Sequence, residues 1–301
     1  MEQAITTVRA NGVSFACLEE GEGPLVLLLH GFPDTAHTWD ATRAALAAAG
    51  FRAVSPFMRG YAPTEIPADG DYRIDALAAD AGALIEALGA EQAILVGHDW
   101  GASAAYGAAI LFPQRIRMLV TVAIPHPASL RPSPRLLWKA RHFFSLRARG
   151  MAGRMRADAF ALVDELLHRW SPAWDVPPGE SAAVKRAFAE PGCVEAAVGY
   201  YRALGLKLPA SQRGRIRMPA IAFAGATDFA LSPSAFERAR SWYEDAYEVI
   251  TLPGGHFLHR EHPAEFNAAL VARLAGLRGS TDPVQHGSEP HPYAALRGQA
   301  T

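Results

Sequence analysis

The chain has 301 residues, half of them hydrophobic, which is enough to bury one large core. Its formal net charge of −1 gives no basic surplus for nucleic acid or for an anionic membrane surface, so neither partner is expected. The first residues lack the pattern of a secretory signal, and the apolar stretch at residues 25–29 is too short to span a bilayer. We therefore expect a globular, cytoplasmic protein.

Two short strand patterns open the chain, with Asn11 and Gly12 between them as the turn of a hairpin. After residue 24, short apolar runs alternate with longer helical patterns. Strands are expected at 5–9, 13–18, 24–29, 52–56, 92–96, 116–123, 220–223 and 247–252, and helices at 38–49, 74–88, 103–111, 234–246 and 264–274. This alternation is typical of an α/β fold with a mostly parallel sheet and helices on both faces, and we expect the hairpin at the sheet edge.

The alternation stops between residues 125 and 212, where a helical pattern interrupted by prolines takes its place. We interpret residues 125–212 as a helical cap inserted into the α/β core. The core would then consist of residues 1–124 and 213–278. Residues 279–301 are rich in Gly, Pro and polar residues, which cannot bury enough surface to offset their ordering entropy, so we expect a flexible tail.

The pattern GHDWG at residues 97–101 follows an apolar strand and is typical of a strained strand-to-helix turn that exposes its central side chain. Gly97 and Gly101 meet the need for small residues at both ends of such a turn. The central residue is Asp99, where a serine hydrolase carries serine. A carboxylate that displaces a leaving group from saturated carbon forms an ester, which water can cleave, whereas serine would form an inert ether. The sequence therefore predicts alkyl transfer to Asp99, followed by hydrolysis.

Three further motifs follow predicted strands, where an open α/β sheet places its ligand site: HGFP at 30–33, ATDF at 226–229 and GGHF at 254–257. The order of nucleophile, acid and histidine resembles the α/β-hydrolase fold, and the four motifs together resemble the α/β-hydrolase epoxide hydrolases. The resemblance covers roughly residues 24–274. It implies a cofactor-independent and metal-independent hydrolase that opens a small apolar epoxide to a vicinal diol.

The resemblance assigns a task to each site residue. His256 would take a proton from water, so that hydroxide attacks the carbonyl carbon of the Asp99 ester. Asp228 would hold the imidazole in the right tautomer and stabilise its charged form. The backbone N–H groups of Phe32 and Trp100 would form the oxyanion hole.

Several of these residues have a simpler interpretation. Asp99 by itself could be a helix N-cap, but the presence of His256 and Asp228 in the other motifs favours its role as the nucleophile. His259 and His262 compete with His256 for the role of base, but they lack the preceding glycines. His98 is interpreted as a hydrogen-bonded core histidine. The two cysteines have no metal-type spacing, and no function is assigned to them.

The predicted cap provides the proton donor in the family pattern. Epoxide opening leaves an alkoxide, and the family usually protonates it with two cap tyrosines. Tyr201, directly before Arg202, resembles the residue that carries one of these hydroxyls. Ala140 stands where the other tyrosine is expected. His142 or Tyr200 could take the place of the second donor, although His142 is also interpretable as an ordinary helix histidine.

A basic run crosses the predicted cap, with no acidic residue between Arg131 and Asp158. Its members are Arg131, Arg135, Lys139, Arg141, Arg147, Arg149, Arg154 and Arg156. One interpretation is a solvated cap face, and the alternative is attraction of an anionic substrate or surface.

Two other functions are compatible with the same core. A haloalkane-type or haloacid-type dehalogenase would use the same three residues on a carbon–halogen bond. Haloalkane dehalogenases typically carry a second halide donor at the position of Phe32, which counts against the haloalkane type. In the haloacid type, an arginine that binds the substrate carboxylate stands at the position of Trp100, which counts against carboxylate substrates. The other alternative is a catalytically inactive α/β-hydrolase that binds a ligand. Ligand binding alone does not require Asp99, Asp228 and His256, so the presence of all three argues against it. The oligomeric state, a homodimer included, is left open.

Overall fold

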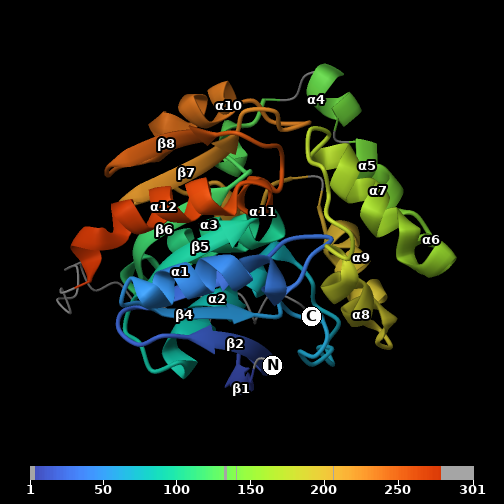
Figure 1. Ribbon diagram of the computed structural model, residues 1–301, viewed down its shortest axis with the longest axis horizontal. Coiled ribbons are helices and arrows are strands. Elements are labelled where there is room, and N and C mark those ends of the chain that lie inside the picture. Colours follow the sequence, from blue (N-terminus) through green and yellow to red (C-terminus); the bar gives the residue numbers. More distant parts are fainter. Residues whose placement is uncertain (1–3, 132–133, 140, 206, 279–301) are drawn as a thin grey trace.

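The structure is a computed structural model, and it describes residues 4–131, 134–139, 141–205 and 207–278 (Figure 1). The strands are β1 Ile5–Ala10, β2 Val13–Glu20, β3 Leu25–Leu29, β4 Arg52–Pro56, β5 Ala93–His98, β6 Ile116–Val122, β7 Ala220–Gly225 and β8 Tyr247–Leu252. They form one sheet in the order β1-β2-β4-β3-β5-β6-β7-β8. Only β2 runs antiparallel to its neighbours, β1 and β4, and all other pairs are parallel.

Helices cover both faces of the sheet (Figure 1). Helices α1 (Asp40–Ala48) and α12 (Pro263–Leu274) contact each other on one face, and α2 (Ile74–Ala87) and α3 (Trp100–Leu111) on the other. Successive side chains of a strand point to opposite faces, so the continuous apolar run of β3 supplies both layers. Val26 and Leu28 join the α1 and α12 cluster, whereas the intervening Leu27 joins the α2 and α3 cluster. The predicted α/β-hydrolase architecture is confirmed.

Helices and loops fill the interval between β6 and β7 in the part of the chain that the structure describes, and they lie at one end of the sheet (Figure 1). The helices are α4 Pro134–Lys139, α5 Arg141–Arg147, α6 Met151–Arg156, α7 Ala161–Trp170, α8 Ala182–Ala189 and α9 Cys193–Arg202. Two further helices come later in the chain, α10 Pro233–Arg238 after β7 and α11 Leu258–Glu261 after β8. The division into core and cap at residues 125 and 212 stays a prediction.

Three helix boundaries differ from the expectation. The expected helix at 38–49 is a 3-10 helix, Ala36–Trp39, followed by α1. The expected helix at 103–111 begins three residues earlier, at Trp100, because the turn after β5 leads directly into α3. The amphipathic stretch at 234–246 ends early, since α10 passes into a 3-10 helix, Ala239–Trp242.

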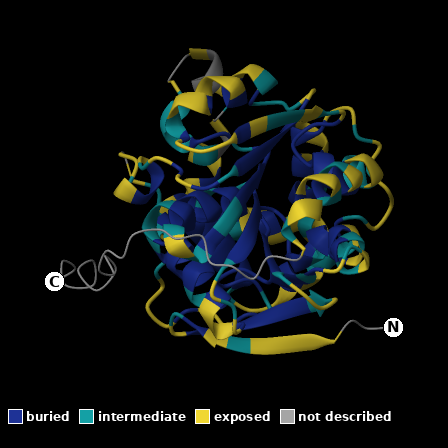
Figure 2. Ribbon diagram, turned by 90° about the vertical axis from the view of Figure 1, so that its left-hand side faces the viewer, coloured by how far each residue is buried: buried dark blue, intermediate teal, exposed yellow. Residues whose placement is uncertain are grey.

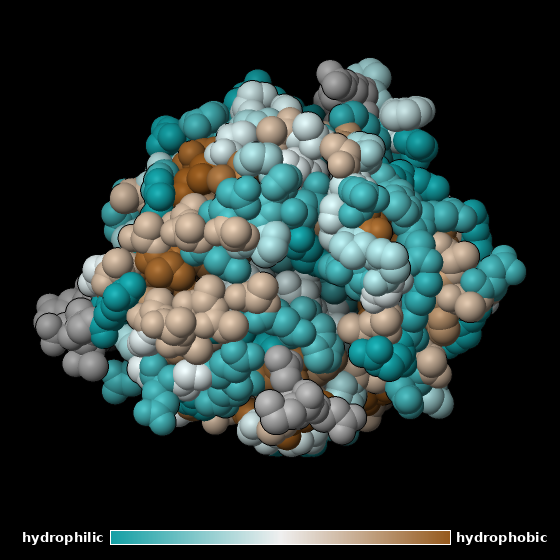
Figure 3. Space-filling model, in the orientation of Figure 1, coloured by the Kyte–Doolittle hydropathy of each residue, from teal (hydrophilic) through white to brown (hydrophobic). Residues whose placement is uncertain are grey.

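The surface is mixed in character. Most outward residues of β1, at the edge of the sheet, are exposed (Figure 2). On the face seen in Figure 3, hydrophobic residues form small patches separated by hydrophilic ones. None of the described helices is long and apolar enough to cross a membrane.

Candidate active site

Asp99 occupies a strained turn between β5 and α3. Its backbone adopts φ 51° and ψ −115°, a conformation that costs a non-glycine residue about 1–3 kcal/mol. A Cβ at Gly101 would lie 2.2 Å from the carbonyl oxygen of Leu29, and one at Gly97 would lie 2.3 Å from that of Gly101. The turn therefore requires both glycines. Asp99 is at the N-cap position of α3, but its side chain makes no capping hydrogen bond and is left for other contacts.

The carboxyl ends of β5, β7 and β8 bring Asp99, Asp228 and His256 together. His256 Nδ1 is 3.0 Å from Asp228 Oδ2, a hydrogen bond, and His256 Nε2 is 3.5 Å from Asp99 Oδ2, an ion-pair distance. Asp228 Oδ1 accepts the N–H groups of Ala230 at 2.7 Å and Leu231 at 2.9 Å. Asp228 is thus fixed on one side by the backbone and holds the imidazole with its other oxygen.

The electrostatics of this cluster favour charged groups despite burial. Burial opposes the protonation of His256, but its contacts with Asp228 and Asp99 and their negative charges raise its pKa to about 10. Burial also disfavours the Asp99 carboxylate, yet its contact with His256, the neighbouring imidazoles and the Phe32 N–H together lower its pKa. At neutral pH the resting site therefore holds a carboxylate beside an imidazolium.

The loop after β3 meets Asp99 from the opposite side. The Phe32 N–H donates to Asp99 Oδ1 at 2.9 Å. This approach requires Gly31, because a Cβ there would lie 2.4 Å from Asp99 Cβ. The Trp100 N–H, the other expected oxyanion donor, makes no hydrogen bond to the Asp99 carboxylate within the described residues.

Tyr201 of α9 is buried against the loop after β3 and against the turn at residues 97–101, which we call the elbow. Its ring meets the rings of Trp100 and Phe32 edge to face, at centroid distances of 5.0 and 5.2 Å. Burial, together with the charge of Asp99, raises its pKa well above the usual value, and a hydrogen bond with the Trp100 side chain opposes this only in part. Tyr201 is therefore a neutral phenol with a proton to donate.

The other expected donors differ from Tyr201. The hydroxyl of Tyr200 donates to the carbonyl oxygen of Arg59 at 2.8 Å, so its proton is engaged in the core. Ala140 lies outside the described residues. His142 belongs to α5, but its side chain lies outside what the structure describes.

The remaining histidines of the motifs have partners elsewhere. Burial lowers the pKa of His98 to about 4, so its imidazole is neutral. Its Nε2 lies 3.0 Å from the carbonyl oxygen of His256, to which a neutral ring donates. His259 Nε2 contacts the hydroxyl of Thr38 at 2.7 Å, and His262 lies at 3.8 Å from a surface carboxylate. Of these histidines, only His256 contacts the Asp99 carboxylate.

A cavity of about 250 Å³ opens on Asp99 and His256 between the sheet end and the helices after β6. Its lining is mostly apolar and comprises Ile74, Asp99, Trp100, Ser103, Ile124, Pro127, Leu130, Phe143, Trp170, Leu204, Leu208, Gln212, Phe229, Ala230, Leu231 and His256. The sequence analysis missed Trp170, whose ring meets that of His256 edge to face, and Gln212. Neither stands in a recognisable motif, so no local signal could have identified them.

Comparisons with known proteins identify the family of the chain. A model of the alpha/beta hydrolase fold family matches residues 24–263, and the chain belongs to that family. It is 29% identical to "Epoxide hydrolase 3" of Mus musculus over 288 residues, covering 92% of this chain and 78% of the relative. It is also 29% identical to "Epoxide hydrolase A" of Mycobacterium tuberculosis over 312 residues, covering 90% of this chain and 97% of the relative.

Among solved structures, the chain is similar to a Bacillus megaterium epoxide hydrolase in complex with an inhibitor. The TM-score is 0.80 at 25% identity, with 89% of this chain and 99% of that chain covered. Within the α/β hydrolases, the resemblance to the epoxide hydrolases is thus confirmed.

Proposed function

We propose that the protein is an epoxide hydrolase that opens an apolar epoxide to a vicinal diol through an ester on Asp99. One observation carries the proposal: a carboxylate, not a hydroxyl, occupies the elbow and faces an imidazole held by a second carboxylate. The apolar cavity beside it suits an uncharged substrate. The similarity to proteins named epoxide hydrolases supports the same reaction.

In the first step, Asp99 Oδ2 attacks a ring carbon and the carbon–oxygen bond of the epoxide breaks. Oδ1 stays on the Phe32 N–H and becomes the carbonyl oxygen of the ester. The ring oxygen takes the proton of Tyr201, which is neutral because its pKa is raised.

Esterification removes the negative charge of Asp99, one of the two charges that raise the pKa of His256. The imidazolium then releases its proton, which replaces the one given up by Tyr201. Neutral His256 can now accept a proton from water, as the second step requires.

In the second step, hydroxide attacks the ester carbonyl carbon. The Phe32 N–H, which already donates to Oδ1, stabilises the oxyanion, and the Trp100 N–H joins it only when the carboxyl carbon becomes tetrahedral. Collapse of this intermediate breaks the ester bond and transfers the carboxyl proton to the departing alkoxide. The diol leaves, and Asp99 and His256 return to the charged resting state. One water and one epoxide are consumed for each diol.

A single turnover in ¹⁸O-water tests the covalent route. Because the water oxygen enters the carboxylate, label is expected in the peptide that contains Asp99. Label found only in the product would show that water attacks the epoxide directly. A haloalkane assayed beside the epoxide checks the dehalogenase alternative, for which halide release is the readout.

Replacing His256 separates the two steps. The His256→Gln variant is expected to form the ester but not to hydrolyse it, so the intact protein should gain the mass of one epoxide. The Asp99→Ala variant is the control and should gain no mass. An adduct in both variants would place the alkylated residue elsewhere.

A further inference from the structure

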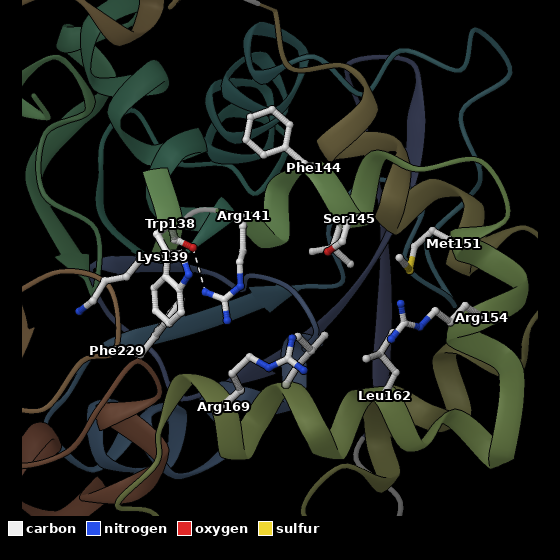
Figure 4. Close-up of a pocket in the computed structure, with 12 residues that line it drawn as sticks. Trp138, Lys139, Arg141, Phe144, Ser145, Met151, Arg154, Leu162, Arg169 and Phe229 are labelled. Atoms are coloured by element: carbon white, nitrogen blue, oxygen red, sulfur yellow. Dashed lines mark hydrogen bonds between the residues drawn. The ribbon is translucent and has the colours of Figure 1, made fainter. Parts of the chain in front are cut away.

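A second cavity, of about 670 Å³, lies among the helices α4 to α7 (Figure 4). We call it the cationic cavity. Its lining consists of Trp138, Lys139, Arg141, Phe144, Ser145, Leu146, Met151, Arg154, Leu162, Leu166, Arg169 and Phe229. The proposed hydrolysis does not use this cavity.

The charged side chains of the lining are all positive: Lys139, Arg141, Arg154 and Arg169. The segment 131–157 contains no Asp or Glu at all, so its residues outside the described structure add no negative charge. Arg169 has an ion pair with Glu165, but at 3.7 Å and half exposed it compensates little of the local charge. In Figure 4 the side chains of Arg141 and Arg169 extend toward the same space from α5 and α7. A cleft lined by one sign of charge concentrates counter-ions.

An apolar surface lies directly beside these charges. Leu146, Met151, Leu162 and Leu166 are buried in the cavity wall. The guanidinium of Arg141 lies 3.9 Å from the centroid of the ring of exposed Trp138 and donates to the Trp138 carbonyl oxygen at 2.8 Å. These contacts hold one cation of the lining against an aromatic ring.

We propose that the cationic cavity binds an organic anion with an apolar body, with a carboxylate among the arginines and a hydrocarbon chain on the apolar wall. Charge complementarity selects this occupant, because an anion offsets the mutual repulsion of the cations and the wall excludes water from the chain. Phe229, next to Asp228, lines both this cavity and the active-site cavity, so the bound anion lies beside the catalytic centre. Binding itself does not depend on the proposed reaction.

The test is the binding of decanoate, measured by calorimetry and by the fluorescence of the exposed Trp138. The variant Arg141→Gln with Arg169→Gln is expected to weaken binding about five-fold or more, equal to about 1 kcal/mol. The matched control, Arg147→Gln with Arg149→Gln, removes two charges from the same basic run. Both control residues are exposed and lie outside the lining, so decanoate affinity should stay unchanged.

Two comparisons make the result decisive. Decanol has the same chain without the charge and is expected to bind more weakly than decanoate. Absence of saturable decanoate binding, equal losses in both double variants, or equal affinity for decanol would each overturn the proposal. Because all four substituted arginines are exposed, thermal unfolding should confirm that the variants keep the fold.

An independent observation concerns Gln212, which is fully buried in the lining of the active-site cavity. Its Nε2 donates to the carbonyl oxygens of Ser103 at 2.9 Å and Ser211 at 3.2 Å. The reversed amide would place Oε1 against these two acceptors, so the orientation is determined. Gln212 Oε1 has no hydrogen-bond partner within the described residues, and a buried acceptor without one costs about 1–3 kcal/mol.

We infer that Gln212 Oε1 accepts a hydrogen bond from a hydroxyl that the substrate carries away from its epoxide ring. This inference rests on the proposed function and makes the substrate class more specific. A site that hydrogen-bonds a hydroxyl discriminates strongly against the analogue that lacks it, because the analogue leaves the acceptor unpaired.

The test compares terminal epoxides of increasing chain length, each with and without a hydroxyl at the far end. Wild type is expected to prefer the hydroxylated member at one chain length, and Gln212→Met should lower that preference in kcat/KM about ten-fold. A merely structural role would lower both rates equally and leave the ratio unchanged, which would overturn the inference. Hydrolysis of neither epoxide by wild type would instead contradict the proposed function.

Discussion

Two adjacent tyrosines of α9 differ in what their hydroxyls contact, and this makes them a matched pair for mutation. Tyr201→Phe removes the proposed donor and should slow alkylation by about 10²-fold or more, whereas packing is retained. Tyr200→Phe removes only the hydrogen bond to Arg59, about 0.5–1.5 kcal/mol of stability, and should leave alkylation nearly unchanged. Pre-steady-state alkylation and thermal unfolding of both variants distinguish the roles. The opposite pattern would assign the donor to Tyr200.

His256 links the charge of the site to stability. Its folded-state pKa is about 10, above the ordinary value of 6.5, so protonated His256 stabilises the fold fully below pH 6.5. This contribution is lost as pH rises through about 10. Unfolding free energies of wild type and His256→Gln across this range should therefore converge as pH increases. A difference independent of pH would mean that His256 is neutral in the folded protein.

Strands and motifs that depend only on a short stretch of sequence were predicted well. The bounds of β4 and β8 agree with the sequence, because each is a short run rich in β-branched or apolar residues and lies between turn residues. The elbow and the motifs with Asp228 and His256 are also local, and the fold brings them together as expected. Gln212 could not be identified in this way. Among the described residues, its Oε1 has no hydrogen-bond partner only because of how the loop before β7 packs against α3, and this contact is not visible in the local sequence.

The strand-to-helix turn is the element on which the site geometry depends most. Gly101→Ala would place a Cβ 2.2 Å from the backbone oxygen of Leu29, and backbone cannot yield as a flexible side chain can. We expect a loss of about 1–3 kcal/mol or more, together with loss of alkylation. The matched control is Gly153→Ala in α6, where a Cβ meets nothing within 4 Å and should stabilise the helix by about 0.5–1 kcal/mol. Denaturant unfolding of both variants should give changes of opposite sign, and a tolerated Gly101→Ala would contradict the close packing.

At the scale of the whole molecule, one buried cation ties three distant segments together. Arg260 of α11 donates to Asp34 Oδ2 at 2.7 Å, just after the HGFP motif, and to Glu180 Oε1 at 2.7 Å, in the predicted cap. Burial alone would lower the pKa of Arg260, but the negative charges of Asp34 and Glu180 raise it above the ordinary value. The network joins the loop that carries Phe32, the segment after His256 and the helices above the site.

Removal of this cation should therefore affect stability and catalysis together. Arg260→Leu leaves two carboxylates without their partner, and breaking a buried pair in this way costs about 3–5 kcal/mol. Arg273 and Glu248 form an exposed pair of similar length, 2.8 Å, so Arg273→Leu is the control and should cost about 1 kcal/mol or less. Unfolding free energies and alkylation rates of the two variants check this. Because Asp34 and His256 lie on segments that Arg260 connects, a stable Arg260→Leu protein with a wild-type alkylation rate would show that the helices above the site are positioned by apolar packing alone.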